Sequence, residues 1–120
     1  MILAIVGDLL FASKIGQTAK LAGIAVDFAT GEQKAIDLAA QQPRLIIVDL
    51  NFNAINPLSL IGKLKQQPGL DQTTILGFLS HVQGDLKLAA QEAGCDLVMP
   101  RSAFSQNLSE ILKQYVVRNF

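Results

Sequence analysis

The sequence predicts an α/β fold in which helices cover both faces of a parallel β-sheet. Short apolar segments alternate five times with segments of helical periodicity along the 120 residues. The apolar segments are uninterrupted, as in strands that are buried on both faces. Hydrophobic residues make up 50% of the chain and charged residues only 17%, which favours a packed core over disorder. We therefore expect one domain that spans residues 1–120.

The first half of the chain contains two strand–helix units followed by a third strand. The expected ranges are Ile2–Val6, about 10–22, Ile24–Phe28, about 30–41 and Leu45–Val48. Gly23 follows the first helix as a typical stop signal. Thr30 and Gln33 have the spacing of a capping box, which predicts the start of the second helix. Pro43 prevents that helix from continuing.

The second half continues the alternation with two more strands and three helices. The expected ranges are about 56–67, Thr74–Leu79, a helix that ends at Gly94, Leu97–Met99 and a closing helix. Asn56-Pro57 has the pattern of an N-cap followed by proline at the first helical position. A single closing helix is predicted from apolar residues at helical spacing, namely Phe104, Leu108, Ile111 and Tyr115.

Five β/α units in a chain of this length predict a flavodoxin-like, doubly wound sheet. We expect five parallel strands in the order 2-1-3-4-5, with five helices in a three-layer αβα arrangement. Right-handed crossovers place the C-terminal ends of all the strands at one edge of the sheet. Four polar residues follow these strands: Asp8, Asp49, Ser80 and Arg101. The topology therefore predicts that they gather at one site, about the size of a phosphate group.

On these residues the sequence resembles the CheY-like receiver domains of response regulators, as an atypical member. The segments that carry the resemblance are Val6-Gly7-Asp8, Val48-Asp49-Leu50, Ser80, Ala93-Gly94-Cys95-Asp96 and Arg101. Each is a weak signal alone, because an apolar run ending in aspartate is common. Their order along the chain and their match to the element pattern make the resemblance specific, and it covers nearly the whole sequence.

The resemblance implies a stand-alone signalling module of two-component, phosphorelay type rather than a classical enzyme. It implies that Asp49 accepts a phosphoryl group from a histidine kinase or a phosphotransfer protein. Mg²⁺ would be held by Asp8, Asp49 and the backbone carbonyl of Asn51, which are the oxygen ligands that a hard cation prefers. Ser80 and Arg101 would contact the phosphate oxygens. A downstream protein partner would read the result, and a homodimer through the fourth and fifth helices is an arrangement that the family often uses.

Four positions depart from the family pattern. Gly7 stands where the family has a second acidic residue, and a missing charge about 5 Å from an ion removes on the order of 3 kcal/mol per unit of ion charge at a dielectric near 20. Arg101 replaces a lysine, and its planar fork differs in shape from an ammonium group. Val98 replaces an aromatic residue that turns inward on activation in many members. His81 follows Ser80 where a small residue is usual, so it would act as a gate at the mouth of the site.

Three further functions remain open from the residues alone. The first is a pseudo-receiver that works without phosphorylation, in which an Arg101–Asp49 contact holds one conformation. The second is a flavodoxin-like enzyme or small-ligand-binding protein that uses the same sheet edge, although the sequence has no cofactor-binding loop. The third is a subunit of a fixed assembly, in which Asp8, Asp49 and Ser80 simply cap loops and helices.

Composition and charge exclude several other classes of protein. Ten basic residues balance ten acidic ones without a basic cluster, which argues against nucleic-acid binding. No segment approaches the roughly 18 apolar residues of a membrane span. The single Cys95 rules out an internal disulfide and fits a reducing cytoplasm, which is the expected location. His81 is the only histidine and Cys95 is the only cysteine. These two residues are too few to form a transition-metal site.

Overall fold

The computed structural model describes residues 1–80 and 83–116, and the position predicted for His81 as a gate lies outside them. The sheet consists of β1 Ile2–Ile5, β2 Val26–Ala29, β3 Leu45–Asp49, β4 Thr74–Leu79 and β5 Leu97–Pro100. The helices are α1 Leu9–Leu21, α2 Glu32–Ala39, α3 Pro57–Gln66, α4 Gly84–Ala93, α5 Arg101–Gln106 and α6 Leu108–Gln114. Strands and helices alternate along the chain as the sequence predicts.

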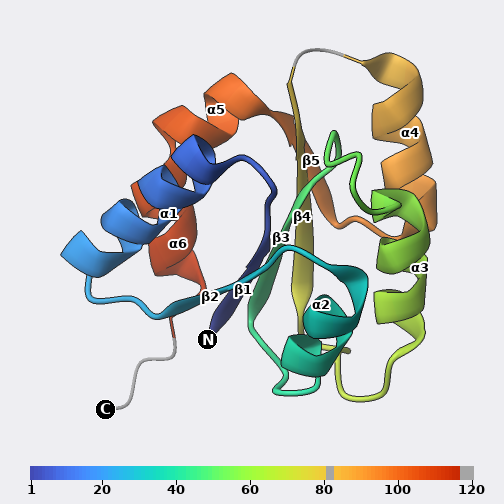
Figure 1. Ribbon diagram of the computed structural model, residues 1–120, viewed down its shortest axis with the longest axis horizontal. Helices are drawn as coiled ribbons and strands as arrows, with labels where there is room; N and C mark the ends of the chain where they lie inside the picture. The colour runs from blue at the N-terminus through green and yellow to red at the C-terminus, as the bar shows by residue number, and fades with distance from the viewer. Residues whose placement is uncertain (81–82, 117–120) are drawn as a thin grey trace.

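All strand pairs are parallel, and the strand order is β2-β1-β3-β4-β5, which confirms the predicted topology. The central strands β1 and β3 are buried along their whole length, so each reads as a continuous apolar run. Figure 1 shows α1, α5 and α6 on one side of the sheet and α2, α3 and α4 on the other. The molecule is therefore a three-layer αβα sandwich.

Each face of the sheet has its own hydrophobic cluster. On the face covered by α2, α3 and α4, the cluster contains Ile5, Val48, Leu60 and Leu64. On the opposite face it contains four aromatic or aliphatic groups from different elements, namely Phe11, Ile47, Phe78 and Phe104. Because strand residues alternate between faces, every central strand contributes to both clusters.

The closing helix differs from the prediction, because it is divided at Asn107 into α5 and α6. The side-chain Nδ2 of Asn107 donates to the carbonyl oxygen of Ala103 at 2.8 Å, and the Asn107 backbone has a non-helical φ of −107° and ψ of 14°. A short amide side chain that bonds to a carbonyl of its own helix competes with the regular ladder. The described residues accordingly contain six helices rather than five.

The start of α2 also corrects a prediction. The N-cap is Gly31, no side chain caps the helix, and the capping box at Thr30 and Gln33 does not form. Gln33 instead donates to Asp37 Oδ1 at 2.9 Å, one turn further along the helix. At α3 the prediction is confirmed, because Asn56 Oδ1 accepts from the Ser59 amide at 3.1 Å and Pro57 is the first helical residue.

Candidate functional site

The parallel topology brings the ends of β1, β3, β4 and β5 to one edge of the sheet. Asp8 lies in the turn between β1 and α1, and Asp49 is the last residue of β3. Ser80 follows β4, and Arg101 is the first residue of α5. The four residues named from the sequence therefore lie at the same edge, where open α/β sheets hold their ligands.

Asp49 is a buried carboxylate with only 6% of its surface exposed. Its Oδ1 accepts a hydrogen bond from the Asn51 amide at 2.9 Å. Burial raises the pKa of Asp49, because it removes water from the ionised form. The Asn51 hydrogen bond and the charge of Arg101 act in the opposite direction, and the charge of Asp8 adds to the increase in pKa.

Asp8 serves two structural purposes with its two carboxylate oxygens. Oδ1 accepts from the amides of Leu10 at 2.9 Å and Phe11 at 3.2 Å, so it is the N-cap of α1. Oδ2 lies 3.5 Å from Nη2 of Arg101. Helix capping thus accounts for one oxygen of Asp8 and leaves the other directed at the cation.

Arg101 connects the two carboxylates. Its Nη2 lies 4.0 Å from Asp49 Oδ2 as well as 3.5 Å from Asp8 Oδ2. The guanidinium carbon is 4.6 Å from the centre of the Phe11 ring and 5.7 Å from that of Phe78, within the range of a cation–π interaction. The Arg101 Nε is buried and has no hydrogen-bond partner within residues 1–80 and 83–116. The aromatic rings and the carboxylates together hold the guanidinium at the acid edge.

Asn51 links the two loops that flank the site. Its Oδ1 accepts from the backbone amide of Ser80 at 2.7 Å, and its Nδ2 donates to Gln83 Oε1 at 3.0 Å. Its backbone amide holds Asp49, as described above. One side chain therefore sets the position of Ser80 relative to Asp49, although the sequence predicted a role only for its backbone carbonyl.

The arrangement offers oxygen donors to a divalent cation, but few of them. Asp8 Oδ2 and Asp49 Oδ2 both face the same nitrogen of Arg101, and carboxylate oxygens are suitable ligands for Mg²⁺. Across the described part of the chain, no three His, Cys, Asp or Glu side chains group together as a metal site. The donor set fits a hard cation in kind, and the guanidinium lies where it would compete for the same oxygens.

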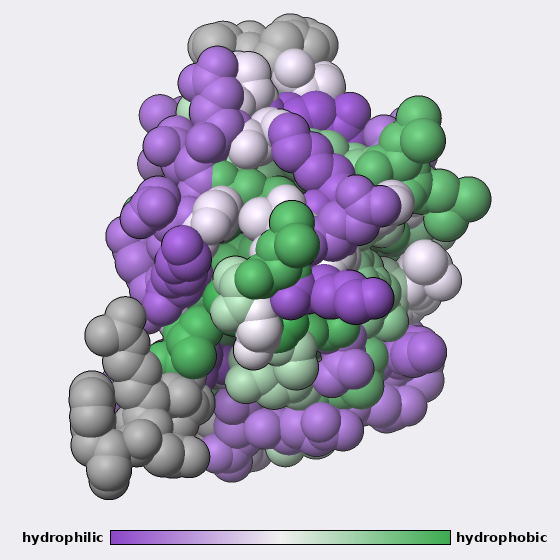
Figure 2. Space-filling model, turned by 90° about the vertical axis from the view of Figure 1, so that its left-hand side faces the viewer, coloured by the Kyte–Doolittle hydropathy of each residue, from purple (hydrophilic) through white to green (hydrophobic). Residues whose placement is uncertain are grey.

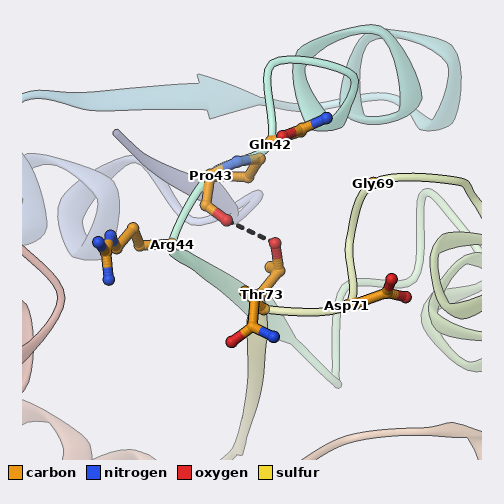
Figure 3. Close-up of a pocket in the computed structure, with 7 residues that line it drawn as sticks. Gln42, Pro43, Arg44, Gly69, Asp71 and Thr73 are labelled. Atoms are coloured by element: carbon orange, nitrogen blue, oxygen red, sulfur yellow. Dashed lines mark hydrogen bonds between the residues drawn. The ribbon is translucent and has the colours of Figure 1, made fainter.

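Two hollows on the surface bear on the choice of ligand. One of about 420 Å³ is lined by residues that precede β3 and β4, including Arg44, Asp71 and Thr73, at the edge opposite Asp49. Figure 3 shows Thr73 donating to the Pro43 carbonyl at its base, a bond of 2.6 Å. A cavity beside Val98 and Gln83 measures about 70 Å³. That volume is well below the roughly 300 Å³ at which small-molecule sites begin, so this cavity would not hold a flavin-sized ligand.

Sequence reasoning missed two side chains that support the site and one that packs beside it. The sequence analysis assigned no role at the site to Phe11 or Phe78, yet both rings support the guanidinium of Arg101. Phe52 packs over Gly7, where a Cβ atom would lie 2.4 Å from its ring. The signal that could have identified these two rings is their place in the sequence, because Phe11 follows Asp8 closely and Phe78 closely precedes Ser80.

No family model matches the sequence, and no curated protein does either. Solved structures do match along most of the chain. A response regulator from Chloroflexus aurantiacus, described as putative, superposes with a TM-score of 0.82 at 22% identity, over 98% of this chain and 97% of that one. The Mn²⁺-bound form of the response regulator Rcp1 superposes with a TM-score of 0.78 at 16% identity, over 98% of each chain.

A third structure, a response regulator from Burkholderia pseudomallei, was determined with a phosphorylated aspartic acid, a calcium ion and citrate. It superposes with a TM-score of 0.76 at 26% identity, over 92% of this chain and 65% of that one. Together with the strand order and the acid edge, these similarities lead to one conclusion. The chain has the fold of the CheY-like receiver domains of response regulators.

Proposed function

We propose that this protein is a receiver-like module of two-component signalling in which Asp49 accepts a phosphoryl group. The observation that carries the proposal is the meeting of Asp8, Asp49 and Arg101 at the C-terminal edge of a sheet with the receiver strand order. A carboxylate nucleophile, a second carboxylate and a cation are the groups that phosphoryl transfer to aspartate needs, because positioning and charge neutralisation carry most of that reaction.

In the proposed reaction, Asp49 Oδ2 attacks the phosphorus atom of a phosphohistidine on a histidine kinase or phosphotransfer protein. Oδ1 accepts the Asn51 amide hydrogen bond, so Oδ2 is the oxygen that faces the incoming group. A P–O bond forms while the P–N bond breaks, and the electron pair of the broken bond returns to the imidazole nitrogen. The product is an aspartyl phosphate, whose oxygens Arg101 and the Ser80 hydroxyl would contact.

Mg²⁺ is the cation proposed for this site, held by Asp8, Asp49 and the backbone carbonyl of Asn51. When bound, it would neutralise the carboxylates and the phosphate. The Mn²⁺ of Rcp1 and the calcium ion of the Burkholderia protein support a divalent cation in proteins of this fold. With two carboxylates and a competing guanidinium, we expect weak binding.

The direct experiment is to incubate the protein with acetyl phosphate and Mg²⁺ and to measure the intact mass. We expect the gain of one phosphoryl group, and we expect Asp49→Asn to abolish it. Asp37→Asn, which changes an exposed aspartate of α2, is the matched control and should gain the group as the wild type does. No gain after long incubation, or a gain that persists in Asp49→Asn, would contradict the proposal.

The position of Arg101 favours a second candidate function, a pseudo-receiver that acts without phosphorylation. The guanidinium already lies against both carboxylates and rests on two aromatic rings, so it can hold one conformation by itself. Under this candidate function, neither acetyl phosphate nor Mg²⁺ changes the amide spectrum of the protein, whereas Arg101→Gln does. An unchanged spectrum for Arg101→Gln would exclude it.

Signalling of either kind requires contact with other proteins, and exposed apolar side chains identify two candidate surfaces. Leu9 and Leu10 follow Asp8 directly and are 81% and 85% exposed, next to the acid edge that a phosphodonor must reach. Figure 2 shows the face that carries α1, where green apolar areas lie among purple hydrophilic ones. Leu88 of α4 and Leu97 of β5 are also exposed. The proposed homodimer would use α4 and the closing helix, which is divided into α5 and α6.

Sedimentation of the wild type and of Leu88→Asp at several concentrations tests the homodimer. We expect the wild type to associate as its concentration rises and the variant to remain monomeric, because a charge at a buried apolar contact is costly.

No helix within the described residues is long and apolar enough to cross a membrane.

A further inference from the structure

The turn after β1 and the loop after β3 meet through one tight contact, between Gly7 and Phe52. A Cβ atom built on Gly7 would lie 2.4 Å from Cε1 of Phe52, 2.6 Å from Cδ1 and 2.9 Å from Cζ. In real structures, non-bonded heavy atoms essentially never lie within 3.0 Å of a Cβ atom. The ring therefore fills the space that any side chain at position 7 would need.

Moving the ring aside would remove packing contacts that the structure shows. Phe52 is half-buried and packs on the hydrophobic cluster of the α2, α3 and α4 face, which contains Ile5 and Val48. Its loop is held at both ends, because the Phe52 amide donates to the Asp49 carbonyl at 3.2 Å and the Ile55 amide donates to the Phe52 carbonyl at 3.4 Å. A rigid aromatic side chain on a closed loop would have to leave its packing to admit a neighbour.

Glycine at position 7 is required by this contact and not by the backbone. The described glycines with positive φ are Gly23, Gly69 and Gly94, and Gly7 is not among them. Position 7 could thus accept an ordinary L-residue if the ring were smaller. The two positions form a complementary pair, one large and one without a side chain.

We propose that Phe52 determines how many carboxylates the acid edge can hold, and hence its affinity for divalent cations, by occupying the space of a side chain at position 7. Position 7 directly precedes Asp8, and a Cβ atom there would point at Phe52, in the loop that follows Asp49 and also contains Asn51. An acidic residue there would add a third carboxylate to Asp8 and Asp49. The inference deepens the proposed function, because it rests on the proposed binding of a divalent cation at this edge.

The expected gain in affinity follows from electrostatics. A carboxylate about 5 Å from a divalent ion, discounted for solvent, strengthens binding at least about tenfold at an effective dielectric near 20. The gain should appear only when the ring has been removed. Gly7→Asp alone should bind Mn²⁺ no more than about threefold better than the wild type, because the new side chain is displaced or the loop is distorted. Gly7→Asp/Phe52→Ala should bind at least about tenfold better.

The binding experiment measures free Mn²⁺ by electron paramagnetic resonance during titration, without a phosphodonor. Phe52→Ala is the control for loss of the ring, and Gly62→Asp is the control for an added carboxylate, because nothing lies within 4 Å of a Cβ atom at Gly62. Neither control should change the Mn²⁺ affinity more than about threefold. Tight binding by Gly7→Asp alone, or no gain in a folded double variant, would overturn the proposal.

A stability cycle tests the steric contact separately. Gly7→Ala should lower the melting temperature, while Gly7→Ala in the Phe52→Ala background should not, so that the two changes are strongly non-additive. Gly62→Ala, a substitution in α3 without a clash, should raise it slightly. Additive effects of Gly7→Ala and Phe52→Ala would show that the ring does not exclude the side chain.

Neither test involves phosphorylation, so their failure is distinguishable from failure of the proposed function. If Asp49 takes no phosphate but the double variant binds Mn²⁺ tightly, the inference about Phe52 holds and the phosphoryl-acceptor role does not. If Asp49 is phosphorylated and the double variant binds no better, the reverse is true.

Discussion

At the scale of single residues, the balance of charge around Asp49 is unfavourable to its ionised form. Arg101 is the attractive partner, but its nearest nitrogen lies 4.0 Å from the Asp49 carboxylate, beyond hydrogen-bond distance, and the guanidinium is partly exposed to solvent. Asp8 adds a like charge, and burial removes water. These effects together raise the pKa of Asp49, with burial as the largest cause. A buried, incompletely paired carboxylate of this kind is typical of functional sites.

Asp49→Asn should therefore stabilise the protein at neutral pH. A group whose folded-state pKa is raised contributes stability that is complete below its unfolded pKa and is lost as pH rises through the folded pKa. The amide does not ionise, so the melting temperature of the variant should exceed that of the wild type at pH 7, and the difference should vanish below the usual carboxyl pKa of about 4. Thermal unfolding across this pH range, without metal, measures the difference. A lower melting temperature at pH 7 would mean that attraction to Arg101 outweighs burial.

At the scale of elements, aromatic packing and one amide side chain hold the site together. Phe104 of α5 stacks on Phe78 of β4 with ring centres 5.1 Å apart and planes 5° apart. Phe11 of α1 tilts against Phe78 at 4.9 Å. The helix that begins with Arg101 therefore packs on the sheet through Phe104, three residues later. Phe104 stacks on Phe78, which is also a ring that the Arg101 guanidinium contacts.

Phe104→Ala should destabilise the protein by about 3–5 kcal/mol, because it removes a fully buried ring from the packing between α5 and β4. Leu21→Ala, at a residue of α1 that is 91% exposed, is the control and should change stability by less than about 0.5 kcal/mol. Urea unfolding followed by circular dichroism measures both. If Phe104→Ala lowered the free energy of unfolding by less than about 1 kcal/mol, this ring would not be what holds α5 against the sheet.

Asn51→Ala should loosen the loop after β4 without unfolding the sheet. The side-chain oxygen of Asn51 accepts from the Ser80 amide at 2.7 Å, so its removal should speed hydrogen exchange at that amide. The amide of Leu79, the last residue of β4, should keep its protection. Asn53→Ala, at an exposed position of the same loop as Asn51, is the control and should leave both amides unchanged. Equal exchange rates at Ser80 in the wild type and Asn51→Ala would contradict the prediction.

At the scale of the whole molecule, the two hydrophobic clusters cannot form independently. β3 contributes Ile46 and Val48 to one cluster and Leu45 and Ile47 to the other. The sheet between them is continuous from β2 to β5. Loss of packing on one face therefore removes the support of the strands that the other face needs.

We expect unfolding in a single transition that both faces share. The chain has one tyrosine and no tryptophan, so the fluorescence of Tyr115, which packs on the α1, α5 and α6 face, reports that side of the sheet. Far-UV circular dichroism reports all the helices. The two midpoints should coincide in the wild type and should fall together in Leu64→Ala, a change in the cluster on the opposite face. Separate midpoints would indicate two folding units.

The sequence alone determined the topology and the membership of the acid edge. Apolar runs such as Ile2–Val6 and Leu45–Val48 are typical of strands in the middle of a sheet, and right-handed crossovers then place Asp8 and Asp49 at the same edge. Local chemistry predicted the start of α3 at Asn56-Pro57, where a cap and a proline act within one turn of helix. Local chemistry did not predict the missing capping box at Thr30 or the division of the closing helix at Asn107. At both places another short-range hydrogen bond forms, from Gln33 to Asp37 and from Asn107 to Ala103.

Only the tertiary structure decided which side chains meet across the edge. Phe52 and Gly7 are far apart in the sequence, and the exclusion of a side chain at position 7 depends on where the β3–α3 loop folds back. The contact of Arg101 with Phe11 and Phe78 likewise depends on how the rings of α1 and α5 pack against Phe78 of β4. Periodicity and spacing act along the chain and specify elements, whereas contact distances and desolvation act through space and become defined only when the elements have packed.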